Sequence, residues 1–163
     1  MKNYILIFIF TAAFLSCSKK ESSEKIFRYN ESQGIENLDP VMASNYQSIW
    51  PLQQSLEGLM EFTKDMNLVD NLAKSHSISE DALTYTFIIH NNIFFHDDDC
   101  FPDKKGRVVK AGDFKYCFER LCDPQTKTRG AWLFRDKVKG AEEYINAAKN
   151  NWNNVKEITG IQT

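Results

Sequence analysis

The strand periodicity between residues 83 and 95 constrains the fold of this 163-residue chain more than any other feature. Residues 83–89 alternate between two faces, with Tyr85 and Phe87 on the same one, and a period of two is typical of a β-strand. Residues 90–92, His-Asn-Asn, are turn-forming, and residues 93–95 are again apolar. We therefore predict a β-hairpin in which residues 83–89 pair with residues 93–95.

Apolar residues at helical spacing predict helices on both sides of this hairpin. A helix over residues 46–60 would carry Ile49, Leu52, Leu56 and Leu59 on one face, with Ser44 or Asn45 as its N-cap. A helix over residues 111–121 would bury one apolar face formed by Phe114, Cys117, Phe118 and Leu121. The other expected elements are strands at 26–31, through Phe62 and at 155–163, and a helix at 140–151.

The N-terminus has the pattern of a secretory signal. Lys2 precedes an apolar run at residues 4–14 that is too short to span a bilayer stably. Residues 14–17, Phe-Leu-Ser-Cys, resemble a bacterial lipobox. This resemblance implies removal of residues 1–16 and lipidation of Cys17. Residues 17–25 are polar and would form a flexible tether, which leaves residues 26–163 as the folded part. The alternative is an ordinary signal peptide that is cut elsewhere.

Composition narrows the classes of function. With 42% hydrophobic residues the chain can build a core. A formal net charge of −2 gives no support for binding nucleic acid through a basic face. The chain also has no glycine-rich phosphate loop and no G-x-S-x-G nucleophile motif, so it predicts neither a cofactor nor a catalytic serine.

Residues 96–100, His-Asp-Asp-Asp-Cys, are the clearest candidate for chemistry. An EF-hand loop counted from Asp97 would need an oxygen ligand and a glycine where Phe101 and Pro102 stand. Zinc would need further His or Cys at regular spacing, which His76 and His90 do not provide. We therefore predict an exposed acidic turn and no metal. The pairing of Cys100, Cys117 and Cys122 stays open between one disulfide with a buried thiol and three buried thiols.

Several ordered motifs carry a resemblance to a known family. They are Phe-Arg-Tyr-Asn-Glu from residue 27, Glu-Asn-Leu-Asp-Pro at 36–40, the segment 54–62, the segment 71–99, the segment 108–124 and the segments around 140–145 and 158–161. Together they resemble the N-terminal part of family 5 bacterial extracellular solute-binding proteins, the oligopeptide- and dipeptide-binding components of ABC transporters. His76, Ala82 and His90 depart from the family's usual Trp, Gly and Arg.

The resemblance implies a mixed α/β fold that forms part of lobe I of a two-lobed periplasmic-binding-protein-like fold, truncated before the second lobe. It implies a non-enzymatic lipoprotein in the bacterial cell envelope, facing the periplasm or the exterior. Such a protein captures a peptide or similar solute and delivers it to ABC permease subunits. By the same resemblance, one set of ligand contacts would come from Ser44, Asn45, Tyr46 and Gln47. Peptide binders commonly place an aromatic residue at the position that matches Gly130, and here the nearby Trp132, two residues later, would supply the contact.

Two other classes of function remain as alternatives. One is a small secreted metal-dependent hydrolase centred on residues 96–100. The other is a surface lipoprotein that serves protein interaction and takes no part in transport. The sequence beyond Thr163 would separate them from a solute receptor, because it would show whether a second lobe exists.

Overall fold

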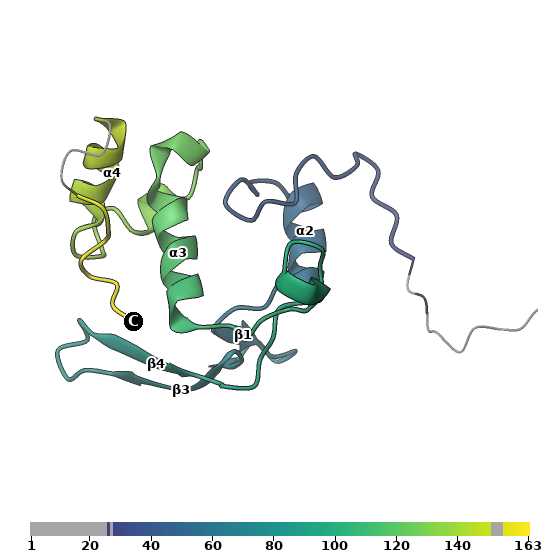
Figure 1. Ribbon diagram of the computed structural model, residues 1–163, viewed down its shortest axis with the longest axis horizontal. Coiled ribbons are helices and arrows are strands. Elements are labelled where there is room, and N and C mark those ends of the chain that lie inside the picture. The colour runs from purple at the N-terminus through teal and green to yellow at the C-terminus, as the bar shows by residue number, and fades with distance from the viewer. Residues whose placement is uncertain (1–25, 27, 151–154) are drawn as a thin grey trace, which may run out of the picture. The chain divides into compact units, whose positions relative to one another are not determined.

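The computed structural model describes residues 26, 28–150 and 155–163. Within them the chain forms three α-helices and two antiparallel two-stranded sheets. Figure 1 labels the helices and strands β1, β3 and β4. The predicted signal peptide, Cys17 and the predicted tether lie outside the described residues. None of the helices described has the length and apolarity needed to cross a bilayer.

Helix α2 spans Tyr46–Ser55 and begins where the sequence predicts. The Asn45 side chain caps it by accepting a hydrogen bond from the Ser48 backbone N–H at 2.9 Å. Pro51 is accommodated inside the helix, which ends at Ser55, five residues earlier than expected, because Leu56 is extended. The short strand through Phe62 is confirmed as β1, Met60–Phe62, and pairs with β2, Leu68–Asp70.

The larger hairpin uses a different partner from the one predicted. Strand β4, Tyr85–Ile89, pairs with β3, Ala73–Ile78, which precedes it in the chain. The connecting turn is closed by hydrogen bonds around Ser79 and Asp81, and Ala82 adopts a positive φ of 57°. The predicted pairing of residues 83–89 with 93–95 is therefore wrong. Phe94 instead forms an isolated bridge with Val108.

Two predicted strands at the ends of the folded part are also wrong. Within residues 26–31, those that the structure describes form no strand, and no described strand pairs with them. Residues 155–163 form turns in place of a strand. Ile158 is fully buried there, and the Gly160 backbone N–H donates to the Lys139 carbonyl at 2.8 Å.

The main core lies between helices α3, Ala111–Cys122, and α4, Ala141–Lys149, both of which the sequence predicts. It is formed by Cys122, Ala141, Tyr144, Ile145 and Ile158, with Phe134 and Val138 among the residues packed against it. The buried face of α3 is shifted from the one predicted, because Cys122 is buried whereas Cys117 is exposed.

Cys100, Cys117 and Cys122 are free thiols, and the first two are exposed. Both arrangements left open by the sequence, a disulfide with one buried thiol and three buried thiols, are therefore wrong. Burial, reinforced by the nearby Glu119 carboxylate, raises the pKa of the Cys122 thiol to about 11. Cys122 therefore behaves as a small apolar core residue and is protonated at neutral pH.

Candidate functional site

The first set of predicted ligand contacts lies at the start of α2. Ser44 and Tyr46 are exposed, and Tyr46 exposes 77% of its surface. Asn45 and Gln47 are half-buried, and their amide groups donate to Glu36 at 3.3 Å and to Gln33 at 2.6 Å. The preceding loop thus holds the Asn45 and Gln47 side chains, whereas Ser44 and Tyr46 are exposed to solvent.

Trp132, the other predicted contact, lies in the 3-10 helix η4, Ala131–Leu133, and is 65% exposed. The Lys137 ammonium lies 5.2 Å from the centroid of its ring, within range of a cation–π contact. A Cβ atom at Gly130 would lie 2.5 Å from Leu121 Cδ1. The Leu121 side chain therefore occupies the space that a larger residue at position 130 would need.

Within the described residues, no hydrogen bond or ion pair joins Trp132 directly to residues 44–47. An indirect connection runs through Asp39 and Arg120, which sequence reasoning did not single out. The guanidinium donates to both carboxylate oxygens, at 2.7 Å for Nη1 to Oδ1 and through a shorter bond for Nη2 to Oδ2. This pair links the loop before α2 to the last turn of α3 across 81 positions of sequence.

Each member of this pair shifts the pKa of the other. The hydrogen bond from Arg120 holds the pKa of the Asp39 carboxyl below its usual value, although partial burial opposes this shift. The hydrogen bond to Asp39 in turn raises the pKa of Arg120. Both groups therefore stay charged at neutral pH, and fork-to-fork pairs of this kind are among the stronger hydrogen bonds in proteins.

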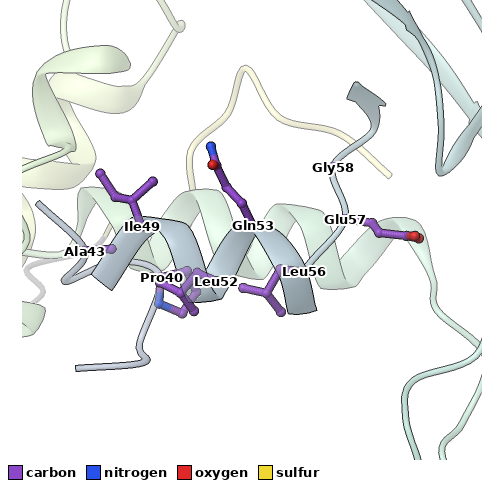
Figure 2. A pocket seen from close by; sticks show the side chains of 8 residues that line it. All are labelled: Pro40, Ala43, Ile49, Leu52, Gln53, Leu56, Glu57 and Gly58. Atoms are coloured by element: carbon purple, nitrogen blue, oxygen red, sulfur yellow. The ribbon is translucent and has the colours of Figure 1, made fainter. Parts of the chain in front are cut away.

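An open apolar hollow runs along α2. It has a volume of about 320 Å³ and is lined by Pro40, Ala43, Ile49, Leu52, Gln53, Leu56, Glu57 and Gly58. In Figure 2 the Pro40, Leu52 and Leu56 side chains lie along one side of the helix. The signal for this hollow was present in the sequence, because Ile49, Leu52 and Leu56 are the apolar positions that predicted the helix.

The acidic cluster at residues 96–100 forms the exposed turn that the sequence predicts. Asp97 accepts hydrogen bonds from Lys105 Nζ at 2.6 Å and from the Gly106 N–H at 3.0 Å. Asp98 accepts one from the Cys100 N–H at 2.9 Å. These bonds hold the pKa of each of the two carboxyls below its usual value. The carboxylates thus organise their own loop, and the described part of the chain contains no cluster of three or more potential metal ligands.

Sequence comparison decides the family. Residues 67–159 match the profile of bacterial extracellular solute-binding proteins, family 5 Middle. The chain belongs to this family. Its relatives include the dipeptide-binding protein DppE of Bacillus subtilis, 33% identical over 84% of this chain and 23% of the relative. The glutathione-binding protein GsiB of Pectobacterium atrosepticum is 32% identical over 66% of this chain and 20% of the relative.

The fold agrees with that of solved structures. Listeria monocytogenes OppA bound to peptide matches with a TM-score of 0.61 and 23% identity, over 76% of this chain and 24% of OppA. The predicted mixed α/β fold, corresponding to part of one lobe of a two-lobed binding protein, is therefore confirmed. The chain spans about a fifth to a quarter of the length of these proteins.

Proposed function

We propose that the intact protein captures a peptide and delivers it to the permease of an ABC importer. Membership of the family of extracellular solute-binding proteins carries this proposal. Relatives named as dipeptide-, oligopeptide- and glutathione-binding proteins support a ligand with a peptide backbone. Binding would use apolar pockets, main-chain hydrogen bonds and domain closure, with no chemical step.

The proposed contacts are Ser44, Asn45, Tyr46 and Gln47 on one side and Trp132 on the other. A peptide held as an added strand takes its affinity from main-chain hydrogen bonds and its specificity from side-chain pockets. Exposed aromatic residues suit such pockets, because they supply a large contact area at a low cost in conformational entropy. The exposure of Tyr46 and Trp132 supports this role.

Isothermal titration calorimetry of the intact protein with peptides of two to eight residues tests the proposal. We expect saturable binding of at least one peptide, and we expect Trp132→Ala to weaken it about tenfold or more, as the loss of an aromatic anchor that the bound ligand covers does. Tyr85→Ala is the matched control, because Tyr85 is similarly exposed but lies on the hairpin strand β4. Binding of another solute and of no peptide would contradict the peptide assignment.

We also propose that the protein is a lipoprotein of the cell envelope, cleaved after residue 16, acylated at Cys17 and tethered by residues 17–25. One acyl chain gives only marginal anchoring, whereas two or three give firm anchoring. Cys17→Ser should therefore shift the mature protein from the membrane to the soluble fraction and abolish incorporation of a labelled fatty acid. Cys100→Ser should leave both unchanged, and fatty-acid labelling that persists in Cys17→Ser would refute the assignment.

A further inference from the structure

We infer that Arg120 is a positioning residue that holds the two proposed ligand-contacting segments, residues 44–47 and the loop that leads to Trp132, in a fixed arrangement. The inference rests on the proposed peptide-binding function. Arg120 itself is assigned no contact with the ligand. It would act through the groups to which its side chain and its main chain are bonded.

The side chain of Arg120 reaches the first segment through Asp39. Both guanidinium ends donate to the two carboxylate oxygens, so the pair fixes orientation as well as distance. The pair is only partly exposed, with about a third of the Arg120 side chain and about a quarter of the Asp39 side chain accessible. Partial burial strengthens the interaction relative to a fully solvated pair.

Asp39 passes this constraint to the start of α2. Its carboxylate also accepts a hydrogen bond from the Val41 N–H at 3.2 Å, and its carbonyl accepts one from the Met42 N–H at 3.0 Å. The turn formed in this way ends at Met42, only three residues before Asn45, whose side chain caps the helix. The carboxylate thus sets the path by which the chain reaches Ser44.

The main chain of Arg120 holds the second segment. Its carbonyl accepts hydrogen bonds from the Thr126 hydroxyl at 3.1 Å and from the Asp123 N–H at 3.3 Å. The next residue, Leu121, fills the space in front of Gly130, two positions before Trp132. One turn of α3 therefore contacts both segments, and loss of the Arg120 side chain would release the first of them from the second.

The test compares Arg120→Gln, Arg120→Lys and Asp39→Asn in the intact protein. Arg107→Gln serves as the matched control, because Arg107 also binds an aspartate, Asp113, through two hydrogen bonds, at 2.7 and 2.5 Å, but the two residues are only six positions apart. Peptide affinity is measured by calorimetry well below each variant's melting temperature. We expect each Arg120 and Asp39 variant to bind the peptide about tenfold more weakly, and Arg107→Gln to change affinity less than twofold.

Arg120→Lys separates positioning from charge, because lysine keeps the charge but cannot form the fork. Wild-type peptide affinity in Arg120→Lys would overturn the inference. It would also be overturned if Arg107→Gln lost as much peptide affinity as Arg120→Gln does. If Arg120→Gln does not fold, the peptide affinity of Asp39→Asn decides the inference, since asparagine keeps the shape of the carboxylate.

Hydrogen exchange supplies a readout that needs no ligand. Amides of residues 41–49 should exchange faster in Arg120→Gln and Asp39→Asn than in the wild type, with no such change in Arg107→Gln. Unchanged exchange in both variants would overturn the inference. Wild-type protein that binds no peptide would refute the proposed function instead, and the exchange result would still decide whether Arg120 positions the segment.

Discussion

Ile145→Ala should lower the free energy of unfolding by about 2–5 kcal/mol, the range observed when a buried isoleucine is truncated. Ile145 lies on α4 and is 1% exposed. It belongs to the core in which α4 meets Cys122 of α3 and Ile158 of the final turns. Because these neighbours come from separate elements, they cannot collapse together onto the smaller side chain, and a cavity should remain.

Chemical denaturation of the intact protein measures this effect. Ile145→Val is the graded control, because it removes one methylene and should cost only about 0.5–1.5 kcal/mol. The free energy of unfolding should fall more in Ile145→Ala than in Ile145→Val, with no change in the slope of its dependence on denaturant. A loss of less than about 1 kcal/mol for Ile145→Ala would show that the α3–α4 packing described above is not the core of the folded protein.

The helices could be predicted from the sequence because their signals are local. Four apolar residues at helical spacing predict α3, and the polar residues Ser44 and Asn45 predict the N-cap of α2, which the structure assigns to Asn45. The early end of α2 was missed because the same apolar spacing continues through Leu56, although the chain there becomes extended.

Strand pairing could not be predicted in the same way, because it depends on which segments meet in space. Strand β3 reads Ala-Lys-Ser-His-Ser-Ile, with few of the β-branched and aromatic residues that mark a strand. It was therefore missed, and β4 was assigned the apolar segment that follows it. The six-residue turn at 79–84 is stabilised by Ser79 and Asp81, whose side-chain bonds become apparent only once the two strands are paired.

The candidate site shows the same limit. The resemblance to the family predicts contacts at residues 44–47 and Trp132, and the structure leaves Tyr46 and Trp132 exposed, as a ligand contact requires. The pair of Asp39 and Arg120 was not foreseen, although both residues lie in motifs that carried the resemblance. A single sequence does not show which of its acidic residues a given arginine will meet 81 positions away.

Gly106→Ala should destabilise the protein by about 1–3 kcal/mol or more, whereas Gly112→Ala, six residues later, should stabilise it by up to about 1 kcal/mol. At Gly106 a Cβ atom would lie 1.7 Å from the Phe95 carbonyl oxygen and 2.9 Å from that of His96. These are backbone atoms, held by the bond from the Phe95 N–H to the Arg107 carbonyl at 2.9 Å. The clash can be relieved only by separating the two backbone segments.

Gly112 provides the matched control because the chemical change is the same and the surroundings are open. It lies in the first turn of α3, and apart from its chain neighbours and the backbone of its own helix no heavy atom lies within 4 Å of the position its Cβ would take. Alanine there removes conformational freedom from the unfolded chain without a steric cost. Thermal unfolding should therefore shift in opposite directions for the two variants. A Gly106→Ala variant as stable as the wild type would mean that Gly106 does not lie against the Phe95 carbonyl.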